Sequence, residues 1–170
     1  MNILVLNGSP RPQGNTKKMI DAFVEAAQGH KIDVIDVCRK NIHGCLACEY
    51  CHTKGHGQCI QQDDMQEIYP LLAEAEMVVL ASPIYYHNLS GQLKCALDRF
   101  YAPDKPAKLK KIAMFLASGS RAMYTGAKFS FNGDFLAYLK AEGMGVFTAS
   151  GEEKNLEETL EAIRDMAKSL

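Results

Sequence analysis

The sequence lacks the features that mark several broad classes of protein. Its formal net charge is −1 over 170 residues and no basic stripe is present, so nothing in it indicates nucleic-acid binding. The apolar stretch at Met1–Leu6 is far too short for a signal peptide or a membrane span. Internal repeats, low-complexity segments and linkers are also missing. We therefore expect one cytoplasmic domain over residues 1–170, with no membrane or nucleic-acid partner.

A regular alternation of apolar runs and helical patterns fills the chain instead. The expected strands are residues 3–6, 32–37, 77–81, 111–117 and 145–149, and the expected helices are 19–27, 64–75, 89–101, 128–142 and 156–170. The near-continuous apolar strands favour an α/β fold with a parallel sheet that is covered on both faces. The connection from about residue 38 to 63 is unusually long for a strand–helix loop, and such loops are usually functional.

A polar loop, Gly8–Thr16, lies between the first expected strand and the first helix. A helix start presents unpaired backbone N–H groups and the positive end of the helix dipole, so it suits an anion such as phosphate. The loop has neither the Gly-x-Gly-x-x-Gly nor the Walker spacing, and Asn15 or Thr16 is expected to cap the helix. The alternative is an ordinary polar turn. The groups expected to hold phosphate are those of Ser9, Arg11, Gly14, Asn15 and Thr16.

This loop resembles the phosphate loop of the NAD(P)H-dependent FMN reductase family, within the flavodoxin-like superfamily. Ser82-Pro83-Ile84-Tyr85-Tyr86 resembles that family's second motif, and the segments 89–94 and 97–99 match its pattern as well. The resemblance covers most of residues 1–120. It implies a flavodoxin-like, doubly wound, five-stranded parallel sheet of order 2-1-3-4-5, with FMN beyond the ends of the first and third strands.

The resemblance also implies which residues contact the flavin. In that family the segment after the proline borders the ring, which assigns Pro83, Ile84, Tyr85 and Tyr86 to FMN, although either tyrosine could equally be a packing residue. Asn88 is expected at the ribityl chain or the ring edge. The loop after the fourth strand closes over the ring in the family, which adds Ser118.

Four of the six cysteines form the pattern Cys45-x2-Cys48-x2-Cys51-x7-Cys59 inside the long connection. Clustered cysteines in a chain expected in the cytoplasm argue for metal or redox chemistry rather than disulfides. The spacing is similar to that of iron–sulfur flavoproteins, which bind a 4Fe–4S cluster beside FMN.

Two alternatives to a cluster stay open for these cysteines. Zinc is one, with His43, His52 and His56 as substitute ligands, and free thiols without metal are the other. The remaining cysteines, Cys38 and Cys95, are expected to be small buried hydrophobic residues. The acidic pair Asp63–Asp64 is expected to cap a helix, and the acidic run from Glu152 to Glu158 is expected to be a solvated helix start.

The leading interpretation is an FMN-dependent oxidoreductase that passes electrons from NAD(P)H through FMN to a quinone, a flavin or another small acceptor. No catalytic side chain is expected, because the cofactor carries the chemistry. One alternative is an iron–sulfur flavoprotein that carries electrons between protein partners, with a ferredoxin-like donor. The other is a non-catalytic flavin- or zinc-binding regulatory module. The resemblance also implies a homodimer or homotetramer.

Overall fold

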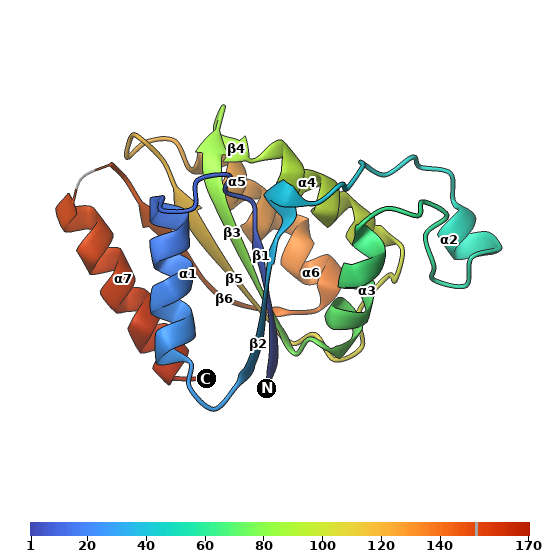
Figure 1. Cartoon of the computed structure of the whole chain (residues 1–170), viewed down its shortest axis with the longest axis horizontal. Helices are drawn as coiled ribbons and strands as arrows, with labels where there is room; N and C mark the ends of the chain where they lie inside the picture. The colour runs from blue at the N-terminus through green and yellow to red at the C-terminus, as the bar shows by residue number, and fades with distance from the viewer. Residues whose placement is uncertain (152) are drawn as a thin grey trace.

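A twisted sheet runs through the centre of the molecule (Figure 1). The computed structural model describes residues 1–151 and 153–170. The main strands, β1 (Asn2–Asn7), β2 (Lys31–Asp36), β3 (Met77–Tyr85), β5 (Lys111–Ala117) and β6 (Glu142–Ala149), lie in the order β2-β1-β3-β5-β6. Each neighbouring pair among them is parallel. The flavodoxin-like α/β fold and its 2-1-3-4-5 order of main strands are thereby confirmed.

Helices cover both faces of this sheet, as Figure 1 shows. On one face lie α1 (Asn15–Ala26) and α7 (Glu153–Lys168), and on the other lie α3 (Met65–Glu74), α4 (Gly91–Asp98), α5 (Thr125–Ser130) and α6 (Leu136–Leu139). A short helix, α2 (Tyr50–Thr53), lies in the middle of the long connection and stands away from the sheet. No helix in the described part of the chain is long and apolar enough to cross a membrane.

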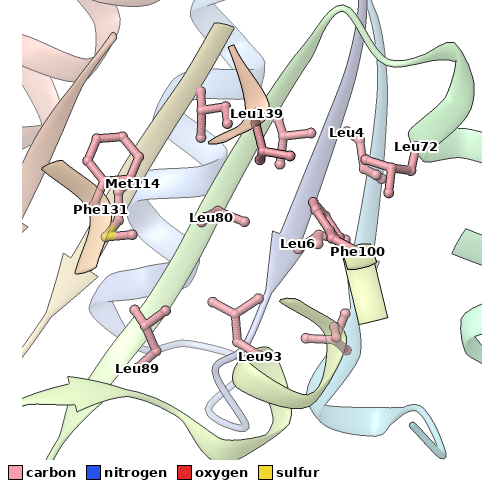
Figure 2. Close-up of a cluster of buried hydrophobic side chains, with 14 of the residues drawn as sticks. Leu4, Leu6, Leu72, Leu80, Leu89, Leu93, Phe100, Met114, Phe131 and Leu139 are labelled. Carbon is pink, nitrogen blue, oxygen red and sulfur yellow. The ribbon is translucent and has the colours of Figure 1, made fainter. Parts of the chain in front are cut away.

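Two hydrophobic clusters hold these layers together, because successive side chains of a strand point to opposite faces. Leu4 and Leu6 of β1 pack on one face, with Leu80 of β3 and Leu93 of α4, as Figure 2 shows. The intervening Ile3 and Val5 pack on the other face against α1 and α7. Full burial of each such side chain stabilises the fold by about 1.5–3 kcal/mol.

The structure corrects several expected boundaries. The helix expected at 128–142 is replaced by α5, a π-helical turn at Phe131–Phe135 and α6, which ends at Leu139 because Lys140 takes a left-handed backbone with φ of 54°. β6 therefore begins at Glu142, earlier than expected. Strand β3 continues past residue 81 to Tyr85 and turns back into the short antiparallel strand β4 (Asn88–Leu89), which the sequence did not indicate. Glu152, the first residue of the acidic run, lies outside the described residues.

Candidate functional site

Segments at the carboxyl ends of β1, β3, β5 and β6 line a cavity of about 370 Å³. That volume lies within the usual range for small-molecule sites, and the carboxyl edge of a doubly wound sheet is where such folds bind ligands. The residues that line it are Ser9, Arg11, Gly14, Asn15, Thr16, Pro83, Ile84, Tyr85, Ala117, Ser118, Gly119 and Gly151.

The first wall of the cavity is the uncapped start of α1. The N-cap residue is Gly14, with an ordinary φ of −76°, and no side chain caps it, so the expectation that Asn15 or Thr16 caps the helix was wrong. Without a capping side chain, the first-turn N–H groups remain as donors for a ligand. The exposed Arg11 adds a positive charge beside them. This arrangement fits a phosphate group, which is the anion that the sequence predicts here.

Buried hydrogen bonds fix the position of Ser9 in this loop. The Ser9 N–H donates to Asn7 Oδ1 at 3.0 Å, and the Arg11 N–H donates to Ser9 Oγ at 3.3 Å. The thiol of Cys38 donates to the Ser9 carbonyl at 2.9 Å. Burial raises the pKa of the Cys38 thiol, and the nearby Asp36 raises it further, so Cys38 stays a neutral donor. The sequence had assigned Cys38 only a packing role.

The second wall is the end of β3. Pro83, Ile84 and Tyr85 line the cavity, whereas Tyr86 sits at the tip of the β3–β4 hairpin with its side chain fully exposed. Asn88 lines a separate pocket under the hairpin, and its Oδ1 accepts the N–H of Leu89 at 2.8 Å. The structure thus gathers every predicted FMN residue at one cavity except Tyr86 and Asn88.

The hairpin tip has an unusual backbone. Tyr86 and His87 have φ of 49° and 64°, a region that favours glycine or asparagine in two-residue turns. The Ala127 N–H donates to the His87 carbonyl at 3.2 Å, and a Cβ at Gly126 would lie 2.6 Å from that oxygen. Gly126 therefore lets α5 support the strained turn. No local sequence pattern predicts this contact.

The third wall is the loop after β5. The Ser118 N–H donates to the Ala149 carbonyl at 3.0 Å, and the Ser118 hydroxyl accepts the Ser120 N–H at 2.9 Å. The buried Tyr124 hydroxyl donates to the same Ala149 carbonyl at 2.8 Å. These bonds shape the loop. A Cβ added at Gly119 would meet nothing within 4 Å, so this residue borders open space. The loop therefore offers the cavity a wall of backbone and small side chains.

A second pocket lies in the long connection and is lined by all four patterned cysteines. Cys45 and Cys48 are exposed, Cys51 is buried and Cys59 is half-buried. Burial raises the pKa of the Cys51 thiol, and the neighbouring Cys59 adds to the shift. Within the part of the chain that the structure describes, no three His, Cys, Asp or Glu side chains already stand as a metal site. The donor set suits a thiolate-bound metal, but the sulfurs have to converge further to bind one.

The histidines of this region do not line the cysteine pocket. His43 Nδ1 lies 3.5 Å from Asp63 Oδ2, and His52 Nε2 lies 2.8 Å from the Tyr101 carbonyl. His56 is exposed at a left-handed turn with φ of 47°. The zinc alternative with histidine ligands therefore has no support from this arrangement.

A family model described as NADPH-dependent FMN reductase matches residues 1–154. The chain belongs to that family. An iron–sulfur flavoprotein of Archaeoglobus fulgidus is 39% identical over 101 residues, which cover 58% of this chain and 45% of that protein. An iron–sulfur flavoprotein of Methanocaldococcus jannaschii is 37% identical over 123 residues, which cover 70% and 62%. The chain spans about half the length of most of these curated relatives.

Solved structures of low sequence identity share the fold of this FMN reductase family member. An NAD(P)H:quinone oxidoreductase from Methanothermobacter marburgensis superposes with a TM-score of 0.77 at 16% identity, covering 98% of this chain and 94% of the other. An azoreductase from Bacillus anthracis superposes with a TM-score of 0.74 at 14% identity, covering 99% of each chain. These likenesses establish the architecture around the cavity.

Some residues that line the cavity were not predicted from the sequence. Ala117, Gly119 and Gly151 line it, and each lies at or just after the end of a strand on the same sheet edge. The rule that ligands bind beyond the carboxyl ends of strands would have found them. Asn7 and Cys38 act beneath the cavity through hydrogen bonds that no local pattern reveals.

Proposed function

We propose that this protein binds FMN in the 370 Å³ cavity and transfers electrons from NAD(P)H to a quinone, a flavin or another small acceptor. The observation that carries the proposal is the convergence of these strand ends and loops at one cavity. An uncapped helix start with an arginine beside it meets a proline-led strand end and a small-residue loop. Membership of the NADPH-dependent FMN reductase family supports the same cofactor and donor.

In this proposal the protein binds and orients, and FMN when bound supplies the hydride and electron chemistry. The first-turn N–H groups of α1, with Ser9, Thr16 and Arg11, hold the phosphate. The segment from Pro83 to Tyr85 and the loop at Ser118 form the walls for the ring. No side chain is assigned a proton-transfer role.

A second candidate function adds electron transfer through the cysteine pocket. The four cysteines share one pocket, and the relatives at 31–39% identity are named iron–sulfur flavoproteins. We infer that Cys45, Cys48, Cys51 and Cys59 are the ligands of a 4Fe–4S cluster. With such a cluster, the protein would accept electrons from a ferredoxin-like partner as well as from NAD(P)H.

Anaerobic purification followed by cofactor analysis and rapid mixing tests both candidates. The first candidate predicts stoichiometric FMN that is bleached by NADPH or NADH and reoxidised by a quinone. The second predicts, in addition, about four irons and four sulfides per chain and faster flavin reduction by reduced ferredoxin than by NAD(P)H. Protein that binds no FMN would refute both, whereas reducible FMN without iron would leave only the first.

A further inference from the structure

The largest fully buried side chain in the described residues belongs to an arginine, Arg99, at the start of the 3₁₀ turn that follows α4. Its side chain is 1% exposed. Nη1 donates to Asp63 Oδ2 at 2.7 Å and to the His43 carbonyl at 3.1 Å, and Nη2 donates to Asp63 Oδ1 at 3.2 Å. His43 and Asp63 flank the four cysteines in sequence, so Arg99 joins both ends of the cysteine loop.

Asp63 is held as an anion by these contacts. Its side chain is 5% exposed, and it also accepts the N–H groups of His43 at 3.0 Å and Met65 at 3.2 Å. Burial alone would raise the pKa of Asp63, but Arg99 and the two backbone donors together hold it below its usual value. The N-cap residue of α3 is Asp64, whose side chain makes no capping hydrogen bond, so the expected helix cap is not formed. Asp63, one residue earlier, accepts the Met65 N–H, and its main partner is the buried guanidinium.

The third nitrogen of this guanidinium, Nε, differs from the other two in its hydrogen bonding. Arg99 Nε is buried and, among the described residues, has no hydrogen-bond partner. An unpaired buried donor costs free energy, so native proteins rarely retain one without a reason. Arg99 also lines the cysteine pocket, beside Cys59.

Tyr69 contacts the backbone of Arg99, and its hydroxyl donates to the Arg99 carbonyl at 3.4 Å. Arg99 and Cys59 line the same pocket. The Cys59 thiol therefore shares this pocket with a fixed positive charge and with an N–H donor that has no partner among the described residues.

We propose that Arg99 is a positioning residue of the cysteine pocket, whose fixed charge and unpartnered Nε–H stabilise sulfur ligands gathered around a metal centre. The inference rests on the proposed cluster at Cys45, Cys48, Cys51 and Cys59. Hydrogen bonds to the sulfurs and nearby charge set the reduction potential of iron–sulfur clusters. One-electron reduction adds negative charge, so a buried cation and a donor favour the reduced form and raise the potential.

The test compares variants of the full-length protein that separate charge from hydrogen bonding. Arg99→Lys keeps the charge and removes the Nε–H donor. The double variant Arg99→Met with Asp63→Asn removes the buried ion pair as a neutral unit, which avoids an unpaired buried charge. The matched control, Lys108→Met with Glu74→Gln, removes an exposed ion pair. Each protein is assayed for Co²⁺ affinity as metal-free protein, for the reduction potential of the reconstituted cluster, for FMN affinity and for limited proteolysis of the loop.

We expect Co²⁺ affinity, read from thiolate-to-cobalt absorption, to fall by about 10–100-fold in both Arg99 variants, as for other groups that support metal ligands. The cluster potential falls in both, more in the double variant than in Arg99→Lys. The exposed-pair control and the FMN affinity stay at wild-type values.

Two outcomes would overturn the inference. If the Arg99 variants only speed proteolysis of the loop, with Co²⁺ affinity and potential unchanged, Arg99 is a mechanical anchor. If the wild-type protein binds neither Co²⁺ nor a cluster, Arg99 has no metal centre to serve. In that second case NADPH bleaching of bound FMN still decides the flavin proposal separately.

Discussion

The cavity proposed to bind FMN, called the flavin cavity below, and the cysteine pocket are built in different ways. The cavity lies at the edge of the sheet, and its loops are fixed by the ends of buried strands and by hydrogen bonds such as Ser9 to Asn7 and Ser118 to Ala149. The cysteine pocket lies between the end of α4 and the long connection, which projects from the sheet at α2 (Figure 1). Its Cys45 and Cys48 are exposed. The ends of the strands thus form the first site, whereas a loop outside the sheet supplies the donors of the second.

Left-handed backbone occurs in both regions, at Tyr86 and His87 of the β3–β4 hairpin and in the cysteine loop. In the cysteine loop, Ala47, Glu49 and His56 have φ between 47° and 55°, and each such non-glycine residue costs free energy. The loop is held at its base by the buried Arg99–Asp63 pair and at α2 by Tyr101, whose hydroxyl donates to Glu49 Oε2 at 3.1 Å. Both contacts tie the cysteine loop to the 3₁₀ turn that follows α4.

The largest expected effect is on metal content, and it should leave the FMN content unchanged. Cys48→Ser should strongly lower the iron and sulfide content, because it removes one of the four thiolates proposed to hold the 4Fe–4S cluster. FMN content should stay at the wild-type level, since Cys48 does not line the flavin cavity. Metal analysis and flavin absorbance of anaerobically purified protein measure both, with Cys95→Ser as the cysteine control. Loss of FMN together with iron would show that the two sites form as one unit.

The next effect is on stability, at the anchor of the cysteine loop. Asp63→Asn should destabilise the protein by about 3–5 kcal/mol, because it leaves Arg99 as a buried charge without its counter-ion. The folded-state pKa of Asp63 is lowered, so its contribution is complete above the unfolded-state value of about 4 and is lost as the pH falls through the folded-state value. Urea unfolding at pH 7 and at about pH 3 should therefore show a difference between wild type and variant that shrinks in acid. An equal difference at both pH values would contradict an ionised Asp63.

A somewhat smaller effect probes the flavin cavity. Arg11→Ala should weaken FMN binding by about 1.5–3 kcal/mol, the loss of a charge-assisted hydrogen bond to phosphate. Riboflavin, which has no phosphate, should bind both proteins equally. The control Lys110→Ala removes the same charge at the opposite end of the sheet, next to the start of β5. Fluorescence titration measures the affinities, and unchanged FMN affinity in Arg11→Ala would remove Arg11 from the site.

The sequence predicted which residues gather at each site better than it predicted the contacts that hold them, for a physical reason. Local signals suffice where a strand, a polar loop and a helix start follow one another, as at Gly8–Thr16. They fail where distant parts meet: nothing near Arg99 in sequence shows that it reaches Asp63, 36 residues away. The hairpin at Tyr86 and His87 was missed for a similar reason, because its left-handed turn lacks the usual asparagine or glycine and depends on contact with Gly126.

The smallest expected effect is on FMN affinity and concerns Cys38, which lies between the phosphate loop and the four patterned cysteines in sequence. Cys38 follows β2, at the start of the connection that carries the cysteines, and its thiol holds the Ser9 carbonyl in the phosphate loop. Cys38→Ala should therefore weaken FMN binding by about 0.5–1.5 kcal/mol, the net value of one neutral hydrogen bond, while Cys38→Ser restores most of the loss. Calorimetric titration with FMN, with Cys95→Ala for comparison, resolves a change of this size. If iron content falls with FMN affinity in Cys38→Ala, the end of β2 couples the two sites. If only FMN affinity falls, the cysteine pocket forms independently of the cavity.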